Sequence, residues 1–169
     1  MSGKMGKKIN LNLDWTFLLG NEENAWFKGY DDSHWRKVQL PHDWSVESPF
    51  SKEYSSGTGY LPGGIGWYRK NFYLPNDLKD KKILLTIEGA YNNSKVWVNS
   101  YYLGYRPYGY STFSFDISDF INEGENSISI RLNRDSTSDS RWFTGSGIYR
   151  NVYLTIKDKI HIIERLYNI

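Results

Sequence analysis

The chain has 169 residues and a formal net charge of +2. This net charge is too small for electrostatic binding to the phosphate backbone of nucleic acid. It contains no Cys, which excludes disulfides, thiolate metal sites and a Cys nucleophile, and its three His are well separated, so no metal site is predicted. No stretch of the sequence approaches the roughly 18 apolar residues of a membrane span, and no signal peptide is visible. We therefore expect one cytoplasmic domain with no nucleic-acid or membrane partner, although export is left open.

The first part of the chain shows little regular periodicity. Residues 1–9 are polar, and we interpret them as disordered or derived from an expression vector. A single helical turn is predicted at 31–35. Residues 41–66 are rich in Ser, Gly and Pro and are predicted to form a long loop, whose aromatic residues argue against disorder. Such a loop in a compact domain is usually functional.

The rest of the chain alternates apolar and polar residues with period two, which indicates β-strands that bury one face. Glycine and asparagine turns separate the strands, as is typical of an antiparallel sandwich or barrel. A second single helical turn is predicted at 117–121, and no βα alternation occurs, so the predicted fold class is all-β. The predicted strands are 83–87, 96–98, 113–115, 127–132 and 151–157.

The residues alone allow several catalytic or binding roles to be considered. A small glycosidase needs two carboxylates at a set separation, and the spacing of the acidic residues selects no pair. Gly145-Ser146-Gly147 lacks the spacing of a nucleophile elbow. The Tyr-rich tract 99–110 is compatible with interface packing or with ligand contact. The segment 141–150 is likewise compatible with a structural cover or with a functional loop.

Several sequence blocks occur in a distinctive order. These blocks are Leu40–Trp44, Gly63–Lys70, Val96–Asn99, Leu103–Tyr105, Gly109–Tyr110, Phe113–Ile117 and Ser140–Arg150. Together they resemble the N-terminal sugar-binding domain of family 2 glycoside hydrolases, most closely the β-galactosidase branch. Ser100 and Arg106 depart from the common pattern of the family, where Gly and His are frequent.

The resemblance implies a jelly-roll β-sandwich of the galactose-binding-like type over residues 10–158, with 159–169 as a linker. It implies downstream immunoglobulin-like and TIM-barrel domains, the barrel carrying both catalytic glutamates, so no catalytic residue is expected here. The parent reaction would be retaining hydrolysis of terminal β-D-galactosides, with a homo-oligomeric parent left open. No cofactor is expected for this domain, and any Mg²⁺ or Na⁺ belongs to the parent enzyme.

By the same resemblance, loops of this domain help to shape the sugar subsite beside the barrel. Arg141 is expected to donate hydrogen bonds to sugar hydroxyls, Asp43 and Asp139 to accept them, and Trp142 to stack. Trp67 completes the predicted substrate-binding set. Interdomain packing is the alternative role for all five residues, and an exposed aromatic patch is expected on the docking face. A free-standing carbohydrate-binding module or lectin is the alternative function.

Overall fold

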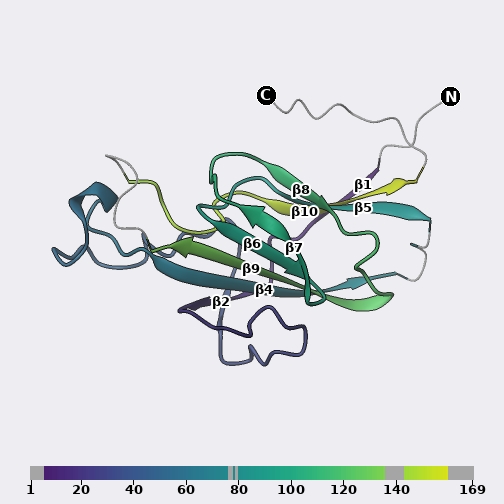
Figure 1. Cartoon of the computed structure of the whole chain (residues 1–169), viewed down its shortest axis with the longest axis horizontal. Coiled ribbons are helices and arrows are strands. Elements are labelled where there is room, and N and C mark those ends of the chain that lie inside the picture. Colours follow the sequence, from purple (N-terminus) through teal and green to yellow (C-terminus); the bar gives the residue numbers. More distant parts are fainter. Residues whose placement is uncertain (1–5, 76–77, 79, 136–142, 160–169) are drawn as a thin grey trace.

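The computed structural model describes residues 6–75, 78, 80–135 and 143–159, which form two packed β-sheets (Figure 1). In this part of the chain, a single short 3₁₀ helix, η1 (Ser56–Thr58), accompanies the strands, and no helix is long and apolar enough to cross a membrane. The strands are β1 (Lys7–Asn10), β2 (Trp15–Leu19), β3 (Arg36–Val38), β4 (Gly64–Leu74), β5 (Lys81–Ile87), β6 (Ser94–Val98), β7 (Tyr101–Arg106), β8 (Phe113–Asp116), β9 (Gly124–Arg134) and β10 (Val152–Asp158).

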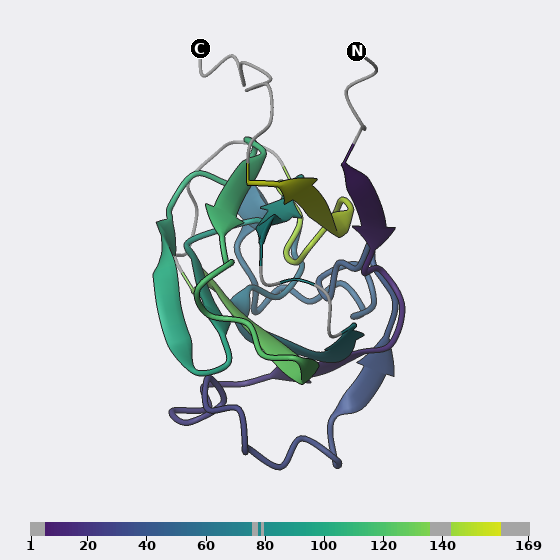
Figure 2. The same ribbon diagram turned by 90° about the vertical axis from the view of Figure 1, so that its right-hand side faces the viewer.

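The two sheets face each other across the core (Figure 2). The four-stranded sheet has the order β1-β10-β5-β8, and the six-stranded sheet has the order β3-β2-β4-β9-β6-β7. All of the strand pairs are antiparallel, and the longest runs from Gly64 opposite Arg134 to Leu74 opposite Gly124. The predicted all-β jelly-roll sandwich is therefore confirmed.

Aromatic rings fill much of the space between the sheets. Phe17 on β2 stacks on Trp44 with ring centroids 5.7 Å apart, and it also packs on Tyr68 of β4 at 4.8 Å. Alternating aliphatic residues of β5, β9 and β10 complete this cluster. The composition explains the arrangement, because a chain with few aliphatic residues can still bury a large apolar area with rings.

The structure corrects two sequence predictions. Strand β1 starts at Lys7 and pairs with β10, so residues 7–9 are part of the sandwich instead of a disordered N-terminus. Strand β4 starts at Gly64, so the long loop ends earlier than predicted. The two predicted helical turns are each a single turn, closed by hydrogen bonds from Trp35 N to Asp32 O and from Phe120 N to Ile117 O, both 3.0 Å.

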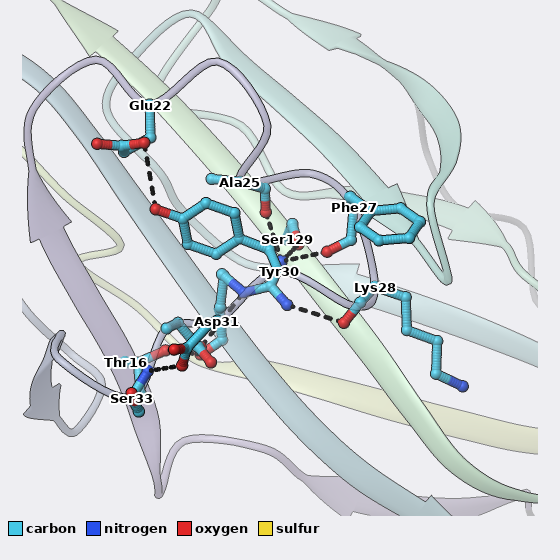
Figure 3. Close-up of polar contacts among 11 residues, drawn as sticks. Thr16, Glu22, Ala25, Phe27, Lys28, Tyr30, Asp31, Ser33 and Ser129 are labelled. Atoms are coloured by element: carbon cyan, nitrogen blue, oxygen red, sulfur yellow. Dashed lines mark hydrogen bonds and ion pairs between the residues drawn. The ribbon is translucent and has the colours of Figure 1, made fainter.

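A loop formed by residues 20–35 covers part of the outer face of the six-stranded sheet (Figures 2 and 3). Arg69 of β4, only 1% exposed, holds this loop in place. Ala25 and Trp35 of the loop pack with Trp67 of the sheet in a second, smaller hydrophobic cluster. The groups that accept hydrogen bonds from Arg69 are the backbone carbonyls of Ala25, Phe27 and Lys28, the hydroxyl of Ser129 and the carboxylate of Asp32.

Candidate functional site

The candidate site lies where two segments distant in sequence run side by side. The amide of His42 donates to the carbonyl of Ile148 at 2.9 Å, and the amide of Trp44 donates to the carbonyl of Ser146 at 3.0 Å. Gly147 in turn exchanges backbone hydrogen bonds with Tyr91 at 2.9 and 3.1 Å. These contacts join three loops at one end of the sandwich. We call residues 42–46 and 145–148 the anchored loop pair.

Asp43 is the polar centre of the anchored loop pair. Its Oδ1 accepts hydrogen bonds from the amide of Ser45 at 2.9 Å and from the amide of Ser146 at 3.0 Å. Burial raises the pKa of Asp43, while the backbone amides of Ser45, Ser146 and Val46 act in the opposite direction. One carboxylate oxygen thus joins the two loops, and a sugar hydroxyl would have to approach the other.

Two glycines make this close approach possible. A Cβ on Gly145 would lie 2.8 Å from Oδ2 of Asp43, and a Cβ on Gly147 would lie 2.2 Å from the carbonyl oxygen of His42. Both residues have positive φ, +76° and +140°, a region that side chains rarely tolerate. The glycines of the Gly-Ser-Gly sequence therefore serve backbone packing against residues 42 and 43.

His42 lies in a polar network beside Asp43. Its Nδ1 is 2.6 Å from the hydroxyl of Tyr68, and its Nε2 is 3.2 Å from Oε1 of Glu47 and 3.1 Å from the guanidinium of Arg36. Burial lowers the pKa of His42, the carboxylate of Glu47 opposes this shift, and Arg36 adds to it. This network connects the anchored loop pair to the core through Tyr68.

The rest of the long loop is held by short polar contacts. Ser45 Oγ is 2.5 Å from the carbonyl of Pro62 and 2.6 Å from Oγ of Ser146. Exposed aromatic rings project from the same region: Phe50 is 77% exposed, and a Cβ on Gly59 would lie 3.7 Å from Cβ of Phe143, which is also exposed. Exposed rings occur here as expected for a docking face, although the extent of the patch stays a prediction.

The predicted substrate-binding residues do not form one cluster in the described structure. Asp43 lies at the anchored loop pair, whereas Trp67 projects from the outer face of the six-stranded sheet. Trp67 is 2% exposed and stacks on Trp97 with centroids 5.4 Å apart, so a direct sugar contact would require the 20–35 loop to move. Asp139, Arg141 and Trp142 lie outside the described residues, and their roles stay predictions.

Sequence reasoning gave His42 and Ser146 no role, although both lie in the blocks that carry the family resemblance. Glycines on both sides of Ser146 were the available signal, because they mark a close backbone approach. Among the residues that the structure describes, no three His, Asp or Glu side chains form a group that could hold a metal ion.

The jelly-roll topology and the anchored loop pair define a galactose-binding-like β-sandwich domain. The chain belongs to glycosyl hydrolase family 2, because residues 10–158 match the sugar binding domain of that family. It is 42% identical over 159 residues to a β-galactosidase of Bacteroides ovatus, an alignment that covers 92% of this chain and 19% of the relative.

Relatives with other names are also similar. A β-glucuronidase of Formosa agariphila is 33% identical over 175 residues, which cover 94% of this chain and 18% of the relative. The crystal structure of a β-glycosidase from Bacteroides vulgatus superposes with a TM-score of 0.87 and 41% identity, covering 90% of this chain and 20% of that one. The chain thus spans about a fifth of the length of these proteins.

Proposed function

We propose that this chain is the non-catalytic N-terminal domain of a retaining family 2 glycosidase that hydrolyses terminal β-D-galactosides. The observation that carries the proposal is the family match over residues 10–158, within relatives that are about five times longer and are named as glycosidases. The 42% identity to a β-galactosidase supports galactosides over glucuronides as the substrate. Catalytic glutamates then belong to a downstream barrel.

Within such an enzyme, the anchored loop pair would fix the position of the segment that carries Asp139, Arg141 and Trp142. Asp43 accepts a hydrogen bond from the amide of Ser146, a few residues beyond this segment in the chain. A bidentate Arg141 and a stacking Trp142 act on a sugar only if the supporting segment is held in one position. Asp43 would therefore act mainly as a positioning residue for the segment that carries Arg141 and Trp142.

The test is hydrolysis of p-nitrophenyl β-D-galactoside and p-nitrophenyl β-D-glucuronide by the complete protein that contains this domain. We expect the galactoside to be hydrolysed with higher kcat/KM and with retention of anomeric configuration. The 169-residue chain alone should hydrolyse neither substrate. A preference for the glucuronide would refute the galactoside assignment, and turnover by the chain alone would refute the non-catalytic role.

The positioning role is tested by Asp43→Asn and Asp43→Ala in the complete protein. The Asn variant keeps an acceptor oxygen for the two amides, so we expect KM to change little, whereas the Ala variant should raise KM with a smaller effect on kcat. Equal effects of the two substitutions would show that the carboxylate charge contacts the substrate directly. Lys52→Ala, an exposed change on the same long loop, is the matched control.

A further inference from the structure

The outer face of the six-stranded sheet carries an uncovered group of aromatic and cationic side chains next to the 20–35 loop. Strand register places Tyr105, Lys95 and Arg131 in one row across β7, β6 and β9. A second row places Tyr102 beside Trp97. We call these five residues the outer-face patch.

The aromatic part of the patch is accessible. The Trp97 and Tyr102 rings lie 5.4 Å apart, and Tyr102 and Tyr105 are 52% and 43% exposed. Trp97 is partly buried, and Trp67 stacks on it. The exposed rings of Tyr102 and Tyr105 lie beside it on the sheet, and amphipathic aromatic side chains of this kind bind ligands with little loss of entropy.

The cationic part of the patch is unusual, because Lys95 and Arg131 are direct cross-strand partners. Like charges in this position destabilise a sheet. Arg131 donates to Oδ1 of Asn21 at a long 3.4 Å, and Asp135 acts on Arg131 only through space. Among the described residues, neither Lys95 nor Arg131 forms an ion pair. Within the described ranges, these two adjacent positive charges therefore lie beside exposed rings without a carboxylate at ion-pair distance.

We infer that the outer-face patch binds an acidic saccharide chain, with uronate carboxylates held by Lys95 and Arg131 and pyranose rings stacked on Trp97 and Tyr102. A carboxylate matches the guanidinium fork and would offset the repulsion between the two cations. The apolar face of a sugar ring fits an aromatic side chain, and its hydroxyls reach the polar surroundings.

Two other occupants fit the patch less well. A second copy of this chain related by a twofold axis would bring Lys95 and Arg131 close to their own copies, which adds repulsion. Single-stranded nucleic acid also stacks on rings, but it needs a basic groove along its backbone, and the chain has a net charge of only +2. The site is also separate from Asp43 at the end of the sandwich, so the inference goes beyond the proposed function and does not depend on it.

The test is isothermal titration calorimetry of the 169-residue chain with an oligogalacturonate. The matched neutral probe is the same oligosaccharide with its carboxylates methyl-esterified, which keeps the rings and removes the charge. We expect binding of the acid form, loss of binding on esterification, and weakening between about 50 mM and about 500 mM NaCl. A sulfated galacto-oligosaccharide and oligo-dT serve as probes of other anions.

Substitutions assign the binding to the patch. Lys95→Gln and Tyr102→Ala are each expected to weaken binding on the order of tenfold, since each removes one charged hydrogen bond or one stacking face. Lys7→Gln on the other sheet and Tyr73→Ala, which replaces a ring that is 78% exposed, should leave affinity unchanged. Folding is checked by urea denaturation, where Lys95→Gln should raise the midpoint because it relieves the cross-strand repulsion.

Several results would overturn the inference. Equal binding of the esterified probe would show that charge is not recognised, and tighter binding of the sulfated probe or of oligo-dT would assign the patch to another ligand. Absence of binding, or equal loss in the control variants, would remove the site. A lower urea midpoint for Lys95→Gln would show that Lys95 has a structural role instead.

Discussion

The clearest quantitative expectation concerns Arg69, the buried cation that holds the 20–35 loop on the sheet. Arg69→Met keeps much of the side-chain volume and removes every hydrogen bond to the loop. Five groups lose a donor: three backbone carbonyls, the hydroxyl of Ser129 and the carboxylate of Asp32. Removing one partner of a buried ion pair costs about 3–5 kcal/mol.

The expected loss lies at the low end of this range, about 3 kcal/mol, because Asp32 keeps some solvent contact and a second donor. Its side chain is 21% exposed, and Thr16 Oγ1 donates to its Oδ2 at 2.6 Å. Carbonyls at the surface of the loop can also be rehydrated when the loop moves. Arg69→Lys should lose less, because it keeps the charge but cannot reach all of the acceptors.

The assay is urea unfolding followed by Trp fluorescence, combined with hydrogen exchange of residues 20–35. The loop amides should lose protection in Arg69→Met before the strands do, because Arg69 donates to three of the loop carbonyls whereas the strand pairings stay intact. Arg150→Met is the control, because Arg150 is exposed and its guanidinium lies over the ring of Tyr149, 5.8 Å from the ring centroid. If Arg69→Met lost no more stability than Arg150→Met, or if the loop kept its protection, the assigned role of Arg69 would be wrong.

Three further predictions concern the anchored loop pair. Burial lowers the pKa of His42 in the folded chain, so its contribution to stability is complete above the unfolded pKa of about 6.5 and is lost as the pH falls below it. His42→Gln should therefore reduce the change in urea midpoint between about pH 7.5 and about pH 5, whereas His34→Gln at an exposed position should not. Asp43→Ala should cost about 2 kcal/mol and Asp43→Asn less than about 1 kcal/mol, and equal losses by urea denaturation would contradict the hydrogen-bonding role. Gly147→Ala should lower the free energy of unfolding by more than about 3 kcal/mol, because its Cβ would lie 2.2 Å from a backbone oxygen. Gly20→Ala, whose Cβ would have no atom nearer than 3.9 Å, should change it by less than about 1 kcal/mol. Similar thermal midpoints for the two variants would show that the backbone relaxes around the new Cβ.

Period-two alternation located strands in which aliphatic residues alternate with mostly polar ones, even where the polar residues are buried, as Ser127 and Ser129 are. Strand β5 (Lys81–Ile87) and strand β9 (Gly124–Arg134) contain the predicted segments 83–87 and 127–132. It missed β4, although this strand forms the longest pairing in the sandwich. The outward residues of β4 include Trp67 and Arg69, which the 20–35 loop buries, so the expected polar alternation is absent. Only a tertiary contact explains why this strand is apolar or charged on its outer side.

The candidate site could be predicted only in part, because it also depends on contacts between residues that are distant in sequence. Asp43 could be selected from the family resemblance, but its contact with Ser146 joins residues 103 positions apart and needed the fold. The predicted grouping of Trp67 with Asp43 assumed that neighbouring motif blocks point toward one ligand. In the structure they point in different directions, because one projects from a sheet face and the other from a loop at its end.

Arg69 and Arg131 lie on the same face of the sheet, and the sequence gives no reason to separate them. The difference between them is in their partners: Arg69 is covered by a loop that supplies a carboxylate and three carbonyls, whereas Arg131 lies opposite Lys95 and meets that loop at Oδ1 of Asn21, 3.4 Å away. Like charges in facing positions destabilise a sheet. A carboxylate bound between Lys95 and Arg131 would offset this repulsion, as the carboxylate of Asp32 does for the guanidinium of Arg69.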